Sequence, residues 1–141
     1  MGNKHLDSIM NFNSDFKYDL EYGILEGESW LHQMLTNKTI EVKSDRMAHI
    51  TGNVFIEFRC RGKLSGISTT QADYWCYKFG NEKALLIGTN ELKELLKELY
   101  QEGKARIING GDNNLSVGLL VKITDLCRAT TKKQLSGLKN D

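Results

Sequence analysis

The chain has 141 residues and a formal net charge of +1 at pH 7, with 40% hydrophobic and 26% charged residues. These values are typical of one globular domain and exclude a disordered or fibrous chain. No apolar run approaches the roughly 20 residues of a membrane helix, and no signal-peptide pattern opens the chain, so we expect a cytoplasmic protein without a membrane partner. The three cysteines lack the spacing of a zinc site or a disulfide framework, which favours a reducing compartment.

The first half of the chain predicts an arm, a helix and two strands. Residues 1–17 are polar, with a few apolar side chains, and predict an N-terminal arm or a short helix. Apolar residues then recur at three- and four-residue spacing over Asp19–Leu35, which predicts a helix. Lys38–Asp45 and Asn53–Arg61 alternate in polarity, as strands do, and only a short linker separates them. We therefore expect these two strands to form an antiparallel hairpin.

The second half predicts further helices and strands around one long amphipathic helix. Thr69 or Thr70 can cap a short helix that runs to about Trp75, and two short strands follow within 76–87. Thr89–Glu102 carries a leucine stripe and predicts the best helix of the chain, which Gly103 ends. Two more strands are expected within 105–123, before a polar and flexible tail, 128–141. The pattern indicates a single domain over residues 1–141.

Glu41 and Lys43 form the first candidate site because both lie on one face of the first predicted strand, about 6.6 Å apart. An acid can bind a hard divalent cation, while a lysine orients the attacking water or offsets phosphate charge. The same pattern also occurs on ordinary solvated strand faces, so this pair alone does not define a site.

The predicted hairpin suggests a metal site. With the turn near Ala48–His49, residue 43 faces 55 and Glu41 faces Glu57. Directly opposed carboxylates destabilise a sheet unless positive charge lies between them, and Mg²⁺ would supply it. The alternative is that Lys43 and Arg59 neutralise the two acids as a surface ladder. Glu28 on the first helix is the third expected metal ligand, with Glu26 as its reserve and Asp45 as a further reserve ligand.

Basic residues surround this candidate site. Segment 41–63 contains five bases and three acids, whereas residues 1–30 contain six acids and two bases. Such local basic character suits binding to a nucleic-acid backbone. The loop that follows adds hydroxyl and backbone N–H donors, although it could equally be a plain turn before a helix cap. The candidate DNA contacts are Arg46, Arg59, Arg61, Lys63 and Ser65.

Three motifs together resemble the PD-(D/E)xK nuclease superfamily, whose fold is restriction-endonuclease-like. They are G-x-x-x-G-E at residues 23–28, E-V-K at residues 41–43, and a serine- and threonine-rich approach to the next predicted helix. Segment 41–75 (EVKSDRMAHITGNVFIEFRCRGKLSGISTTQADYW) is similar to a family of small phage-encoded nucleases. The resemblance covers about residues 18–79. It implies an α/β fold with a mixed sheet flanked by helices, and Mg²⁺-dependent cleavage of DNA, with Mn²⁺ as a substitute ion.

The chain departs from the superfamily pattern because no strand with an aspartate fits between the first helix and the E-V-K strand. In one alignment, Glu41 and Lys43 are the E-x-K pair and the separate aspartate is missing. In the other, which we prefer, Glu41 replaces that aspartate, Glu57 is the glutamate of the second strand, and Arg59 occupies the lysine position. Lys43 would then act from the neighbouring strand.

We therefore expect a metal-dependent DNA endonuclease of phage type. Lys43, Glu41 and Glu57 are the catalytic candidates, and Glu28, Glu41 and Glu57 are the metal ligands. Junction or branched DNA is an expected substrate by analogy with the resolvases of the superfamily. A homodimer is a further expectation, since a small monomer offers one cut per duplex. The alternatives are a catalytically inactive nuclease-like module that binds nucleic acid or supports assembly, and a small enzyme or inhibitor unrelated to nucleic acid.

Overall fold

A computed structural model describes residues 26–128 and residue 130. The chain divides into two compact units, Met1–Lys38 and Thr39–Asp141, each of which is described by itself. In the first unit residues 26–35 are helical, which agrees with the predicted helix over its described part. The predicted arm and most of the predicted tail lie outside the described residues.

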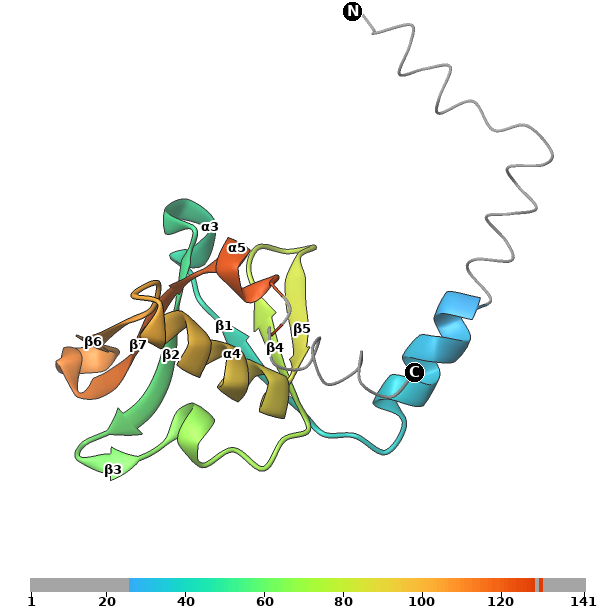
Figure 1. Ribbon diagram of the computed structural model, residues 1–141, viewed down its shortest axis with the longest axis horizontal. Coiled ribbons are helices and arrows are strands. Elements are labelled where there is room, and N and C mark those ends of the chain that lie inside the picture. The colour runs from blue at the N-terminus through green and yellow to red at the C-terminus, as the bar shows by residue number, and fades with distance from the viewer. Residues whose placement is uncertain (1–25, 129, 131–141) are drawn as a thin grey trace, which may run out of the picture. The chain divides into compact units, whose positions relative to one another are not determined.

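The second unit contains two β-sheets (Figure 1). The first sheet has the order β1-β4-β5, where β1 is Ile40–Ser44, β4 is Tyr74–Lys78 and β5 is Ala84–Gly88. β1 is parallel to β4, and β5 is antiparallel to it. The second sheet is antiparallel with the order β3-β2-β7-β6, formed by Lys63–Leu64, Asn53–Cys60, Ser116–Lys122 and Arg106–Gly110. The unit is therefore a mixed α/β structure, as the sequence predicts at this level.

The prediction that the strands within Lys38–Asp45 and Asn53–Arg61 form an antiparallel hairpin is wrong. β1 and β2 belong to different sheets, and the partner of β1 is β4, with Ile40 opposite Tyr74 and Lys43 opposite Tyr77. The reason lies in the linker, which forms the short helix α3 (Ala48–Thr51) instead of a tight turn. Gly52 ends α3 with φ of +71° and directs the chain into the second sheet. The expected pairing of Glu41 with Glu57 is therefore absent.

The predicted helix from Thr69 or Thr70 to Trp75 is also wrong. A single 3-10 turn, η1 (Gly66–Ser68), is followed by chain without helical structure until β4 begins. Two polar side chains hold this segment to β1 and to the residue before it: the Thr70 hydroxyl donates to Glu41, and Asp73 Oδ2 accepts a hydrogen bond of 2.9 Å from the Thr39 N–H. Such side-chain hydrogen bonds compete with those of a helix.

One core joins both sheets to the long helix α4 (Thr89–Gln101). Leu92, Leu95 and Leu99 of α4 are fully buried, which confirms the predicted leucine stripe. The core also contains side chains from three strands of the two sheets: Val54, Ile56, Trp75, Tyr77 and Val121. Gly103, with φ of +74°, follows the C-cap residue Glu102 and ends the helix, as predicted. The short helical segments η2 (Asp112–Asn114) and α5 (Ile123–Leu126) complete the described elements.

Within the described part of the chain, no helix has the length and apolar character needed to cross a membrane.

Candidate functional site

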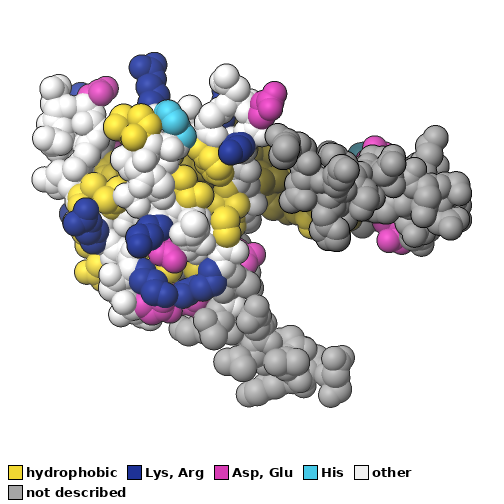
Figure 2. Space-filling model, turned by 90° about the horizontal axis from the view of Figure 1, so that it is seen from above, with side chains coloured by type: hydrophobic (Ala, Val, Ile, Leu, Met, Phe, Trp, Pro, Cys, Tyr) yellow, Lys and Arg dark blue, Asp and Glu magenta, His cyan; other side chains and the backbone are white. Residues whose placement is uncertain are grey.

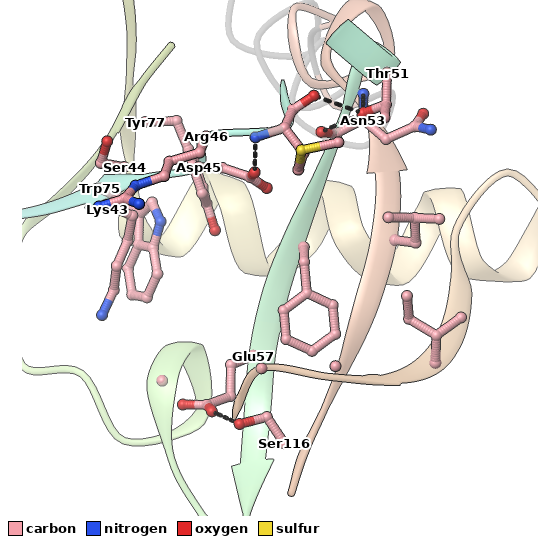
Figure 3. Close-up of a pocket in the computed structure, with 17 residues that line it drawn as sticks. Lys43, Ser44, Asp45, Arg46, Thr51, Asn53, Glu57, Trp75, Tyr77 and Ser116 are labelled. Atoms are coloured by element: carbon pink, nitrogen blue, oxygen red, sulfur yellow. Dashed lines mark hydrogen bonds between the residues drawn. The ribbon is translucent and has the colours of Figure 1, made fainter. Parts of the chain in front are cut away.

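A pocket of about 660 Å³ lies between the two sheets (Figure 3). β1 and the residues after it supply Lys43, Asp45 and Arg46, and β2 supplies Phe55 and Glu57. Trp75 and Tyr77 of β4 and Ser116 of β7 complete the polar and aromatic part of the wall. The pocket thus collects two cationic and two acidic side chains from segments that are distant in sequence.

The alternation of β1 places Glu41 and Lys43 on its less exposed face. Lys43 Nζ lies 2.8 Å from Glu41 Oε1 and 5.3 Å from the centre of the Trp75 ring. Ile40 and Val42, on the other face, are 42% and 62% exposed. The structure therefore places Glu41 and Lys43 on one strand face, as predicted, and joins them as an ion pair.

Glu41 is held in its ionised form. Burial raises the pKa of Glu41, but hydrogen bonds from Lys43 and Thr70 and the charge of Lys43 lower it by more, so that the pKa lies below its ordinary value. Lys43 lines the pocket, whereas Glu41 does not. This arrangement suits Glu41 as the group that positions Lys43.

Glu57 is fixed by contacts on two sides. The Ser116 hydroxyl donates to Glu57 Oε1. At the backbone of Glu57, Gly66 approaches the strand so closely that a Cβ at this position would lie 2.2 Å from the Glu57 carbonyl oxygen. Gly66 also has φ of +53°, which side chains rarely adopt. A β-bulge between Glu57 and Arg59 follows directly, and bulges often redirect a side chain beside a functional site.

Asp45 lines the pocket, although the sequence did not predict it as a main metal ligand. It follows β1, lines the pocket with Lys43 and Glu57, and accepts a hydrogen bond of 2.9 Å from the Met47 N–H. Sequence reasoning kept Asp45 only as a reserve ligand. The available signal was its spacing, since Asp45 lies two residues beyond Lys43 in the alternating segment.

The predicted set of three glutamates is not assembled in the second unit. Glu28 is exposed on the helix of residues 26–35, in the first unit, and Glu41 and Glu57 lie on strands of different sheets. Among residues 26–128 and residue 130, no group of three His, Cys, Asp or Glu side chains could hold a metal ion. The described residues thus supply no metal site made of protein ligands alone.

The pocket carboxylates do fit a hydrated ion that is shared with a substrate. Mg²⁺ keeps several waters and is commonly bound through one or two carboxylates plus substrate phosphates. Asp45 and Glu57 each offer one such carboxylate on the pocket wall, and neither forms an ion pair with another described residue.

The predicted DNA contacts fall into two groups. Arg46 is exposed and lines the pocket, whereas Arg59, Arg61 and Lys63 are exposed on the β2–β3 hairpin. Arg61 and Gly62 form its two-residue turn with φ of +50° and +76°, a conformation typical of tight hairpins. Ser65 is half-buried, and its hydroxyl has no hydrogen-bond partner among the described residues. Figure 2 shows basic side chains at several separate places on one face, among apolar and acidic side chains.

Tyr77 contributes a neutral hydroxyl. Its side chain is buried, and burial together with the negative charges of Asp45 and Glu41 raises its pKa far above the ordinary value of 10.0. Tyr77 therefore remains protonated at every physiological pH and can donate a hydrogen bond.

No protein-family model, curated protein or solved structure matches the chain. The chemistry of the pocket therefore has to be argued from its own residues. Two carboxylates, an ammonium and a guanidinium in one pocket are suited to binding a phosphate group and to activating water beside it.

Proposed function

We propose that the chain is a metal-dependent DNA endonuclease, a phosphodiester hydrolase of restriction-endonuclease-like type, with the pocket between the two sheets as its active site. The observation that carries the proposal is that Lys43, Asp45 and Glu57 line one pocket with Arg46. The resemblance of residues 18–79 to small phage nucleases supports the choice of DNA as the substrate.

Each charged residue of the pocket has a distinct task in this proposal. Arg46 binds a phosphate oxygen of the DNA backbone, because its guanidinium presents several donors in a planar fork. Lys43 orients the attacking water and offsets the charge that develops on the phosphate. Glu41 positions Lys43 through the 2.8 Å ion pair. Ser116 in turn fixes the carboxylate of Glu57.

Asp45 and Glu57 lie toward opposite ends of the pocket (Figure 3), so one of the two carboxylates would bind Mg²⁺, with Mn²⁺ as a substitute, together with the substrate phosphate; the ion would supply a water of lowered pKa and a counter-charge for the phosphate. The groups on the β2–β3 hairpin, Arg59, Arg61 and Lys63, bind the backbone away from the cut, with Ser65 beside them.

A second candidate is a nuclease-like module that binds nucleic acid without cutting it. The observation in its favour is that Lys43 is already paired with Glu41, while residues 26–128 and residue 130 hold no group of three metal-ligating side chains. In this case Arg46 and the hairpin bases would still bind DNA, with an affinity that falls as salt rises, because phosphate contacts release counterions.

A cleavage assay separates the two candidates. The full chain is incubated with linear, supercoiled, single-stranded and four-way-junction DNA in Mg²⁺, Mn²⁺ or EDTA. We expect metal-dependent cutting that Lys43→Ala and Glu57→Gln each reduce by at least about 100-fold, the scale of losing a transition-state contact. Lys83→Ala and Glu82→Gln are matched controls, since both residues are exposed in the turn between β4 and β5 and lie outside the pocket.

Three results would decide the matter. Cutting that is lost in both pocket variants and kept in both controls supports the nuclease. Cutting that survives in the pocket variants means that this site is wrong. Salt-dependent binding without any cutting supports the non-catalytic module, and the absence of both rejects both candidates.

A further inference from the structure

A second cavity, of about 450 Å³, lies on the other face of the four-stranded sheet, against one edge of α4. Strand alternation separates the two cavities: Leu120 and Ile108 line the first, and their neighbours Leu119 and Ile107 line the second. Its apolar walls come from β2, η1, α4, β6 and β7 and are formed by Phe58, Ile67, Leu96, Tyr100, Ile107 and Leu119.

These walls leave apolar surface uncovered. Tyr100 is 52% exposed and Ile107 is 51% exposed, although both are large hydrophobic residues beside a well-packed core. A contiguous apolar depression on a folded unit commonly marks a binding site. Its volume lies within the range of about 300–1,000 Å³ that small-ligand pockets occupy.

The charged side chains at the rim of this cavity are all positive. Lys93 and Lys97 line it, one turn apart on the same face of α4, and no acidic side chain of the described residues lines it. Neither lysine forms an ion pair with a described residue. The two ammonium groups therefore remain available for an anion.

Other contacts of α4 occupy its opposite edge. Arg128 binds Glu102 through two hydrogen bonds of 2.9 and 3.1 Å and lies 3.7 Å from Glu98. At about 100° per residue, Glu98 lies roughly 140° around the helix from Lys93. The segment that follows β7, as far as Arg128, thus covers the far edge of α4 and leaves the edge with Lys93 and Lys97 open.

We propose that this cavity binds a small anionic amphiphile, in which an alkyl or aryl body fills the apolar part and a carboxylate or phosphate group meets Lys93 and Lys97. Burial of the body supplies the nonspecific part of the affinity, and the two lysines select the anion. The Ser68 hydroxyl lies in the same wall as a further donor. This site is independent of the proposed nuclease pocket.

Decanoate, at concentrations below those at which it forms micelles, is a suitable probe. It is titrated into the full ¹⁵N-labelled chain while amide shifts are recorded, in parallel with decanol and decyltrimethylammonium, which have the same chain length. We expect saturable shifts in α4 and β6 with decanoate, weaker binding of decanol and no binding of the cation. Lys93→Gln combined with Lys97→Gln should weaken decanoate binding by about tenfold or more, equivalent to at least about 1.4 kcal/mol.

Two further variants make the outcome decisive. Ile107→Ser removes apolar wall at a half-exposed position, where folding should tolerate the change, and should also weaken binding. Lys78→Gln combined with Lys83→Gln removes two exposed lysines outside the cavity and should leave binding unchanged. Vesicles of neutral lipid, with and without anionic lipid, test whether the anion can be a membrane headgroup instead of a free molecule.

Saturable decanoate binding that both the lysine and the Ile107 variants weaken supports the proposal, and added vesicle binding with the same sensitivities identifies a lipid as one source. Equal binding of the cationic probe, or decanoate binding unchanged in the variants, overturns it. Binding to anionic vesicles alone, unaffected by Ile107→Ser, also overturns it, because that result would indicate surface charge without a cavity.

Discussion

At the scale of single residues, the ion pair between Glu41 and Lys43 shows how neighbours set the charge state of a site. Thr70 and Lys43 both donate hydrogen bonds to Glu41, and together they keep its carboxylate ionised despite partial burial. Lys43 also lies against the Trp75 ring, so that the lysine is restrained from two directions. A lysine held in this way needs little rearrangement to meet a phosphate, which is why we assign it the central task in the pocket.

Glu41→Gln should change how the free energy of unfolding depends on pH in the acidic range. Because the pKa of Glu41 in the folded chain lies below the ordinary value of 4.5, its ionised form stabilises the fold above that pH, and this contribution is lost as the pH falls through the folded pKa. Urea unfolding of wild type and variant between about pH 6 and pH 3 measures the effect. We expect the two free energies of unfolding to converge toward low pH. A constant difference would show that the charge of Glu41 has no part in stability.

Tyr77→Phe should act at the opposite end of the pH scale. The pKa of Tyr77 is raised mainly by burial, so the neutral form stabilises the fold below the ordinary value of 10.0, and this contribution is lost as the pH rises beyond it. The variant should therefore lose less stability than wild type between about pH 9 and pH 11. Thermal unfolding at several alkaline pH values tests this, and parallel curves for the two proteins would contradict it.

At the scale of elements, the local sequence pattern predicted the single helices and strands better than it predicted how the strands pair. The alternating segments became β1 and β2, and the leucine stripe became α4, because these periods decide which face is buried. The helix expected before Trp75 failed because Thr70 and Asp73 hydrogen-bond to β1 and the residue before it, partners 29 to 34 residues away that no local pattern reveals. The hairpin failed because its linker had enough residues to form α3.

Gly66→Ala should disturb the strand that carries Glu57. The new Cβ would lie 2.2 Å from the Glu57 carbonyl oxygen, and φ of +53° is unfavourable for alanine. We expect a loss of about 1–3 kcal/mol in the free energy of unfolding, measured with urea. Gly80→Ala is the matched control, because Gly80 has φ of +89° and a Cβ added there would meet no heavy atom within 4 Å. Equal losses in the two variants would show that the approach to Glu57 is unimportant.

At the scale of the whole molecule, the pocket exists because two sheets share one core. Lys43 and Asp45 belong to the first sheet and its extension, and Glu57 belongs to the second. Charge and alternation in the sequence identified these residues. The predicted pairing of Glu41 with Glu57 was wrong, since a strand pattern does not state which strands will be neighbours. The α/β class was predictable because it follows from local periods in the sequence. The order of the strands was not, because it follows from how the elements pack.

Leu95→Ala should loosen both sheets together. Leu95 is fully buried in α4, within the one core that includes β2, β4 and β7 side chains. We expect a loss of about 2–5 kcal/mol, as for other large-to-small core changes. Amide hydrogen exchange should show protection falling by a similar factor in the β1–β4 and β2–β7 ladders. If only one ladder lost protection, the two sheets would be separate cooperative units. Leu64→Ala is a suitable control, because Leu64 is 61% exposed on β3.

The parallel pairing of β1 with β4 has a consequence for how the chain is made. Ile40 pairs with Tyr74, so β1 leaves the ribosome 34 residues before its partner, the separation that also holds between Thr39 and Asp73. At about 5–20 residues per second this interval lasts about 2–7 s. During that time the backbone N–H and C=O groups of β1 that later pair with β4 have no partner, so this strand edge is open to pairing with another extended chain. The strands of the β4–β5 hairpin are close in sequence, so we expect this hairpin to form before β1 pairs with β4.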